Sequence, residues 1–226
     1  LGLAVIHSAQ LAPGHREALS PSLTLGWRLK NESFLKDVDA VDNMLLSVSG
    51  SIINEDIDLA RGDVRYYLYK GIWTSDNGYG WYDGSNDKYT YSKRGENEDL
   101  GFIKRKELSL SFKTSLWKHF VTLDANFFIN SMEGYLIDSP TFFPSHLNTS
   151  YPQGSFMPVL NYNNDRRVGF DFALNFNRKF GETDLSLGLT GTYYNTKATK
   201  VDENNVEAYQ NRQGKAIDGI WGYKSA

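Results

Sequence analysis

The 226-residue chain contains no cysteine, only six prolines and no excess of either charge sign. Without cysteine, disulfide scaffolds, thiolate metal sites and cysteine nucleophiles are excluded. The 24 Lys and Arg residues are matched by 27 Asp and Glu residues, so the chain lacks the basic excess of nucleic-acid-binding proteins and no nucleic-acid partner is expected. No apolar run approaches the roughly 18 residues of a transmembrane helix, which excludes a helical membrane protein.

The chain nevertheless has enough apolar material for a folded domain, with 40% hydrophobic and 14% aromatic residues. Its mean hydropathy is −0.47, which is hydrophilic on average. A membrane β-barrel remains open, because its strands alternate apolar and polar residues and therefore average to a hydrophilic composition.

An alternation with period two dominates the chain. It predicts strands over residues 22–30, 44–52, 107–116, 121–129, 168–176 and 185–190; residues 121–129, for example, read VTLDANFFI. The alternation lasts about 9–11 residues, the length of a tilted strand that crosses a bilayer. No window shows a period of 3.6, so little helix is expected. The predicted fold is all-β, an antiparallel transmembrane β-barrel wall.

The polar side of these strands consists mostly of Ser, Thr, Gly, Asn and Asp, which suits the wall of a wide, wet lumen. An eight-stranded barrel needs side chains that fill its interior, so small residues favour a wider barrel. The carboxylates Asp124 and Asp171 would need facing positions in a cleft to act as a glycosidase pair, and a lumenal position is favoured instead. The side chains expected to face the lumen are Arg28, Glu107, Lys113, Asp124, Asn126, Asp171 and Asn175.

The connections alternate between short and long. Tight turns are predicted at 117–120 and 178–183, and long irregular stretches at 54–102, 131–166 and from 196 onward. Short turns at one end and long loops at the other are typical of outer-membrane barrels, whereas such long loops argue against a compact soluble domain. Trp27 and Phe180 lie next to turns and continue the apolar side of the alternation, so they fit an aromatic girdle at the membrane interface. Trp117 and Phe120 also lie next to a turn but do not continue the apolar side of the alternation, and they fit a girdle less well.

Residues 76–87, DNGYGWYDGSND, form the most distinctive loop. Its oxygen-rich side chains could hold Ca²⁺, but the order of an EF-hand and its bidentate Glu are missing. Its aromatic side chains could stack on sugars, pack against a partner protein or pack within the loop. The loop residues expected to contact a ligand or partner are Trp73, Tyr79, Trp81, Tyr82, Asp83, Tyr151 and Tyr162.

No motif for catalysis or metal binding is present. The four histidines show no metal-ligand spacing, and no nucleophile elbow or phosphate-binding loop follows a strand. We therefore expect no enzymatic activity, no cofactor and no metal.

Several segments look like the motifs of one protein family. Residues 21–29 (PSLTLGWRL) and 32–35 (ESFL) look like a PSxSxGWxxxxExF stretch, and 45–52 (LLSVSGSI) is similar to LKLRGSYG without its Arg. Residues 97–107 (NEDLGFIKRKE) look like NPDLKWEKTKE, 167–171 (RVGFD) resemble NxGxE, and 219–224 (GIWGYK) are like the loop that follows. The matches occur in the family's order, and the chain therefore resembles the SusC/RagA-like TonB-dependent transporters of Bacteroidetes outer membranes.

The resemblance implies that residues 1–226 are a portion of one 22-stranded barrel domain, from its middle to later part. A plug domain with a TonB box would precede the segment, and the final strands would follow it. The implied function is import of oligosaccharides or peptides across the bacterial outer membrane, driven by the TonB complex with a SusD-like lipoprotein as a lid. The segment would supply barrel wall in the lipid bilayer and long extracellular loops. The alternative is a soluble secreted β-sandwich that binds glycans through aromatic loops.

Overall fold

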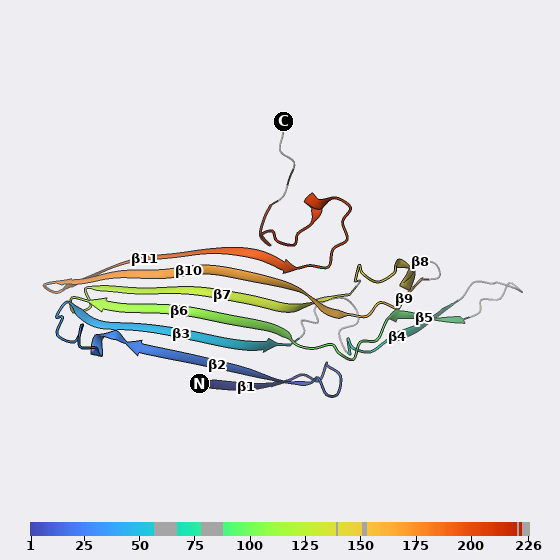
Figure 1. The fold of residues 1–226 in the computed structure, drawn as a ribbon, viewed down its shortest axis with the longest axis horizontal. Helices are drawn as coiled ribbons and strands as arrows, with labels where there is room; N and C mark the ends of the chain where they lie inside the picture. The colour runs from blue at the N-terminus through green and yellow to red at the C-terminus, as the bar shows by residue number, and fades with distance from the viewer. Residues whose placement is uncertain (57–66, 78–87, 139, 151–152, 221, 223–226) are drawn as a thin grey trace, which may run out of the picture.

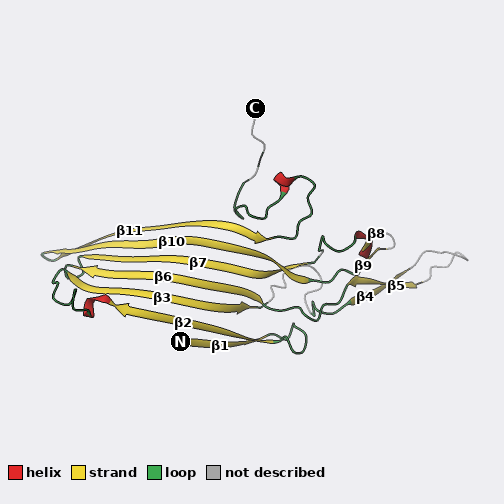
Figure 2. Ribbon diagram, viewed as in Figure 1, coloured by secondary structure: helices red, strands yellow, loops and turns green. Residues whose placement is uncertain are grey.

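The computed structural model describes residues 1–56, 67–77, 88–138, 140–150, 153–220 and 222. Seven strands form one sheet in the order β1-β2-β3-β6-β7-β10-β11, and β4–β5 and β8–β9 form two-stranded sheets (Figures 1 and 2). All neighbouring strands are antiparallel. The prediction of an all-β antiparallel fold is therefore confirmed, with an open sheet.

The main sheet consists of β1 (Gly2–His7), β2 (Glu17–Arg28), β3 (Val41–Glu55), β6 (Ile103–Leu116), β7 (Val121–Ile137), β10 (Leu160–Phe180) and β11 (Thr183–Lys200). The small sheets consist of β4 (Ile72–Asn77), β5 (Lys88–Arg94), β8 (Asn148–Ser150) and β9 (Gln153–Ser155). Helical structure in the described part of the chain is limited to three 3-10 turns at Leu29–Asn31, Ser145–Leu147 and Ala208–Gln210. None of the described helices has the length and apolarity needed to span a membrane.

The strands are longer than the alternation predicts. Residues 131–137 and 160–166, expected to be irregular, continue β7 and β10 and pair with each other, with Leu160 opposite Ile137. The expected loop over 131–166 is therefore wrong at both ends. Gly134 has a positive φ, and register shifts at Asn163 interrupt the regular pairing of this part of the ladder, so the side chains do not keep a period-two alternation. Strand β1, and the two hairpin strands within 54–102, also escaped the sequence analysis.

The shortest turns and the longest loops lie at opposite ends of the sheet, and the β2–β3 connection lies at the same end as the short turns (Figure 1). The turn end holds the β6–β7 turn and the β10–β11 turn, where Gly181 has φ +61°, the left-handed geometry that a two-residue hairpin requires at its first central position. Strand β10 continues through Arg178 to Phe180, so this turn is tighter than predicted. The loop end holds the long connections, from which β4–β5 and β8–β9 project beyond the sheet.

The buried apolar cluster lies among the loops and not on a face of the sheet. It is formed by Leu11, Ala12, Tyr69, Leu100, Phe102 and Val159. These residues come from the β1–β2 loop and from the segments before β4, β6 and β10, so the loops pack against one another. By contrast, Leu25 and Leu187 in the sheet are 64% and 65% exposed, and no other described element covers the apolar side of the strands there.

Candidate functional site

The strand register separates the sheet into two chemically distinct faces. On the polar face, one cross-strand row contains Gly26, Ser47, Ser111, Asn126, Asp171 and Thr192. On the apolar face, the adjacent row contains Leu25, Val48, Leu110, Phe127, Phe170 and Tyr193. Because side chains alternate along every strand, every second residue counted from a row residue lies on the same face as that residue.

The apolar side chains form an oblique band on their face. Its boundary toward the loop end is marked by Leu19, Ile52, Leu108, Val168 and Tyr193, on β2, β3, β6, β10 and β11. Measured from the apolar row, Leu19 lies six residues beyond Leu25, whereas on β11 the boundary is Tyr193, which is in the row itself. The boundary at the turn end, from Trp27 on β2 to Leu185 on β11, slopes in the same direction. The band is therefore inclined to the strands by about one residue per strand.

All seven residues expected to face a lumen lie on the polar face. Three strands are linked there by side chains: the Ser111 hydroxyl donates to Asn126 Oδ1 at 2.8 Å, and Asn126 Nδ2 donates to Asp171 Oδ2 at 3.3 Å. Lys113 and Asp124 face each other at 4.0 Å, both well exposed. That this face lines a channel stays a prediction.

A charged cluster extends the polar face toward the loop end. A cavity of about 280 Å³ is lined by Glu55, Arg105, Asn130, Met132, Tyr135, Asp165 and Arg167. Arg105 forms an ion pair with Glu107, and the Arg167 guanidinium lies 5.3 Å from the ring centroid of Tyr194. Of the residues in this cluster, the sequence analysis identified only Glu107. The sequence did hold a signal for Arg105, because Arg105 and Glu107 are two residues apart and therefore lie on the same face of a strand.

Two groups in this cluster have shifted pKa values, and both lie beyond the apolar band. Burial, together with the neighbouring Asp165 carboxylate, raises the pKa of Tyr135 to about 12. Burial also raises the pKa of Asp165, against the opposing effects of a hydrogen bond from Tyr135 and the charge of Arg167. The cluster therefore offers fixed cations beside a carboxyl group that is reluctant to ionise.

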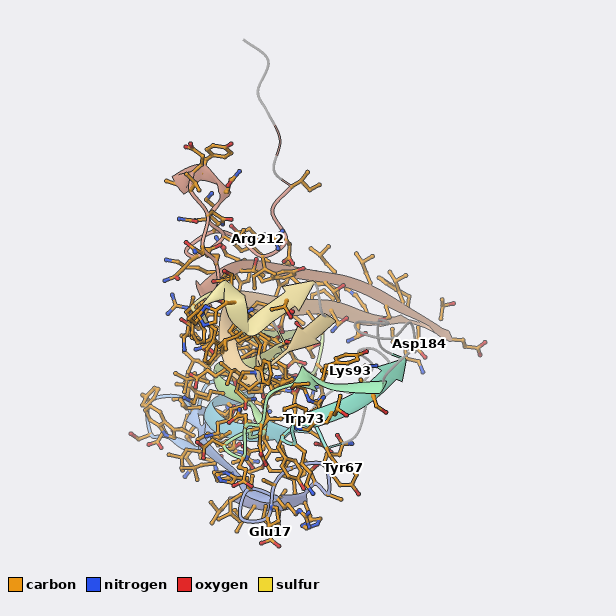
Figure 3. All side chains as sticks on the ribbon, turned by 90° about the vertical axis from the view of Figure 1, so that its right-hand side faces the viewer. Glu17, Tyr67, Trp73, Lys93, Asp184 and Arg212 are labelled. Carbon is orange, nitrogen blue, oxygen red and sulfur yellow. The ribbon has the colours of Figure 1, made fainter. Side chains whose placement is uncertain are left out.

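The hairpins at the loop end enclose a second, polar cavity. It has a volume of about 750 Å³ and is lined by Tyr91, Ser92, Lys93, Asn148, Thr149, Gly154 and Ser155. Figure 3, viewed from the loop end, shows the β4–β5 hairpin with Trp73 and Lys93 in front of the sheet. The 62% exposed Trp73 meets Phe156 edge to face, with ring centroids 5.9 Å apart. Trp73 therefore bridges two loops while keeping an open ring face.

Tyr162 belongs to a different aromatic group, at the junction of β10 and its loop. Its ring lies 5.2 Å from that of Phe142, and Lys200 Nζ lies 3.7 Å from its ring centroid. Asp202 fixes the neighbouring chain by accepting hydrogen bonds from the backbone and hydroxyl of Thr141. Trp73 and Tyr162 thus occupy separate sites. The other expected contact residues, Tyr79, Trp81, Tyr82, Asp83 and Tyr151, lie outside the described residues.

Aromatic side chains also gather at the turn end. Trp27 Nε1 donates to Glu32 at 2.7 Å, and the Arg178 guanidinium lies 5.0 Å from the ring centroid of Phe180. Phe120, which is off parity, packs against Phe176 of the apolar face at 6.3 Å between ring centroids. The preceding turn residues Trp117, Lys118 and His119 all have positive φ, which breaks the alternation and gives Phe120 its position.

Solved structures share this fold. The structure of the RagAB peptide transporter matches with a TM-score of 0.65 and 15% identity, over 86% of this chain and 20% of that chain. The structure of the RagAB peptide importer in the 'closed-closed' state matches with a TM-score of 0.66 and 15% identity, over 88% of this chain and 20% of that chain. The structure in the 'open-open' state matches with a TM-score of 0.66 and 16% identity, over 85% of this chain and 19% of that chain. No protein-family model and no curated protein matches the chain. The chain spans about a fifth of the length of the solved chains, and at this identity it shares their fold.

Proposed function

We propose that the chain forms part of the wall and extracellular loops of an outer-membrane barrel that imports peptides or oligosaccharides. The observation that carries this proposal is the oblique apolar band. A shift of about one residue per strand, at ~3.3 Å per residue and ~4.8 Å between strands, corresponds to a tilt of roughly 35–40°. Strands of membrane barrels are tilted by roughly 35–45°, so the band would lie level in a membrane.

The width of the band supports the same proposal. On β7 it runs from Val121 to Ile129, about 30 Å of strand and roughly 24 Å along the membrane normal after tilting. This agrees with the ~25 Å apolar band of outer-membrane barrels. In water, such an exposed apolar face would promote aggregation, whereas in lipid it is the favoured surface.

The edges of the sheet favour a larger barrel, as in the 22-stranded barrel that the sequence resemblance implies. Among the described residues, β1 pairs only with β2, and β11 pairs along its length only with β10. Open edges of long strands invite further pairing, which closure of a barrel would satisfy. Further strands, together with the plug domain, would come from parts of the protein outside residues 1–226.

Transport requires ligand capture and release, and the polar face and the loop-end cavity supply binding surfaces without a covalent step. The charged cluster around Arg105 and Asp165 presents both signs of charge, which suits the termini and side chains of a peptide. The similarity to the RagAB peptide transporter favours the peptide over the oligosaccharide. A SusD-like lipoprotein would cover the loops as a lid, and the TonB complex would drive release through the plug.

The experiment expresses the full-length protein in a host with and without TonB. We expect the protein in the outer-membrane fraction, soluble only in detergent, with a gel mobility that changes on boiling. Labelled peptides and oligosaccharides are supplied separately, and uptake of one of them should require TonB and coincide with co-purification of the lid lipoprotein. A native protein that stays monomeric in buffer without detergent would contradict the proposal and favour the secreted glycan-binding β-sandwich. Uptake that is independent of TonB would contradict the transport mechanism alone.

A further inference from the structure

Cations accumulate on the outer side of the sheet immediately beyond the apolar band. The row that follows the last apolar residues of β6, β7 and β10 contains Lys106, Ser131, Arg166 and Lys197. Lys106, Arg166 and Lys197 are all exposed. Lys104 lies one step further out on the same face, opposite Glu133. One band boundary is therefore marked by basic side chains from three strands.

The two faces differ in how their charges are balanced at this level. On the polar face, Arg105 is paired with Glu107, and Arg167 lies near Asp165. On the outer face, Glu133 binds Lys106 Nζ at 2.6 Å. Arg166 and Lys197 have no acidic partner within salt-bridge distance among the described residues. Arg166 and Lys197 therefore keep unneutralised charge on the side that continues the apolar band.

The pairing of Arg166 with Lys197 is itself unfavourable. The two residues are directly opposite each other in the β10–β11 ladder, and like charges at such a position destabilise a sheet. Lys106 lies two strands from Arg166 in the same row, roughly 10 Å away at ~4.8 Å per strand. An anion that bridges these cations would relieve the repulsion and form charge-assisted hydrogen bonds.

We propose that Lys106, Arg166 and Lys197 bind the phosphate groups of a membrane lipid in the leaflet at the loop end. This inference rests on the proposed membrane position of the sheet. The cations lie where the apolar band ends, which is the depth of lipid headgroups. Acyl chains of the same lipid would lie along Leu108 and Val168 below them. An outer leaflet of phosphorylated glycolipid would supply such phosphates at this depth.

The test uses the full-length protein in phosphate-free detergent, with diphosphorylated lipid A as the probe and native mass spectrometry as the readout. Arg166→Gln and the triple variant Lys106→Gln, Arg166→Gln, Lys197→Gln are compared with Arg167→Gln. The control removes the same charge from the adjacent residue on the opposite face. With about fivefold in affinity per unpaired basic residue at a membrane surface, the single variant should bind roughly fivefold more weakly. The triple variant should bind at least roughly 25-fold more weakly, because Lys106 is already paired with Glu133. The control should bind like wild type.

The outcomes separate this inference from the proposed function. If all variants enter detergent as heat-modifiable barrels and the triple variant retains lipid A, the lipid site is wrong and the barrel proposal stands. Equal binding of inorganic phosphate by the wild type would also overturn it, because the site would then serve a soluble anion. If the triple variant keeps lipid A but loses the lid lipoprotein, the surface binds protein and the inference is again wrong. A wild-type protein that needs no detergent would overturn both proposals.

Discussion

The side-chain amide of Asn161 forms two hydrogen bonds with the main chain of Gly101. Asn161 Oδ1 accepts from the Gly101 backbone N–H at 2.8 Å, and Asn161 Nδ2 donates to the Gly101 carbonyl at 3.0 Å. The same Nδ2 donates to the Gly134 carbonyl at 2.8 Å. One side chain at the start of β10 thus ties the segment before β6 to β7, at the level where the loops pack together.

Asn161→Leu should therefore loosen the loop end without disturbing the strands. It leaves three main-chain groups without their partner, and each part-buried unsatisfied group costs about 1–3 kcal/mol. Hydrogen exchange of the full-length protein should show lost protection around residues 100–102 and 134. Asn205→Leu, at an exposed side chain that bonds only Asn211 among the described residues, serves as the control. Unchanged exchange in Asn161→Leu would mean that backbone pairing alone holds the loops.

The two faces of the sheet should respond differently to an added charge. Leu110→Arg and Phe172→Arg place a cation in the apolar band, at a cost of about 2–4 kcal/mol near the bilayer midplane. Ser111→Arg and Asn175→Arg place it on the polar face and should be tolerated. The measurement is the amount of heat-modifiable protein in the outer-membrane fraction. Equal loss in both pairs would show that the band does not face lipid.

Gly169→Ala should impair assembly through crowding. A Cβ at this position would lie 2.5 Å from the Tyr193 carbonyl oxygen and 2.8 Å from Phe128 Cζ, so β10 and β11 would have to move apart. Overpacking of this kind costs about 1–3 kcal/mol. Gly26→Ala is the matched control on the same face, because its nearest neighbour is Leu45 Cδ1 at 3.5 Å. Urea unfolding of the refolded full-length protein measures the difference, and equal stability of the two variants would contradict the prediction.

The carboxyl group of Asp165 should make stability depend on pH. Its pKa is raised in the folded protein, chiefly by burial, so the folded state favours the protonated acid. That contribution is complete below the unfolded value near 3.9 and is lost as the pH rises through the folded value. Asp165→Asn mimics the protonated acid at every pH. The wild type should therefore lose stability relative to this variant as the pH rises above about 4.

Urea unfolding midpoints of the two refolded full-length proteins, compared over a series of pH values, test this dependence. Parallel profiles for wild type and Asp165→Asn would show that the carboxyl group ionises equally well in both states.

The contacts of the aromatic residues in segment 76–87 remain a prediction from sequence. Trp81→Ala and Tyr82→Ala should weaken ligand uptake or lid co-purification by at least about tenfold while barrel assembly is retained, because truncation of an aromatic hot spot costs ~2 kcal/mol or more. Trp73→Ala should have a smaller effect, since its ring already packs against Phe156. Uptake and lid binding at wild-type level in all three variants would show that the loop packs only on itself.

The sequence alone determined the two faces of each strand. Leu108 and Leu110 alternate with Ser109 and Ser111, and any ladder that contains them must place the pairs on opposite faces, because successive side chains of a strand point in opposite directions. This is why the seven polar residues selected from the alternation all lie together on one face. The separation of short turns from long loops followed from the same spacing.

The tertiary structure decided everything that depends on how one strand is aligned with the next. The oblique band exists only through the register that places Leu25 in line with Tyr193, and register is a property of the whole sheet. The pairing of residues 131–137 with 160–166 was invisible because the irregular pairing around Gly134 and Asn163 breaks the period-two alternation. The contact of Trp73 with Phe156 and the opposition of Arg166 and Lys197 likewise depend on segments far apart in the chain, which only the folded sheet brings together.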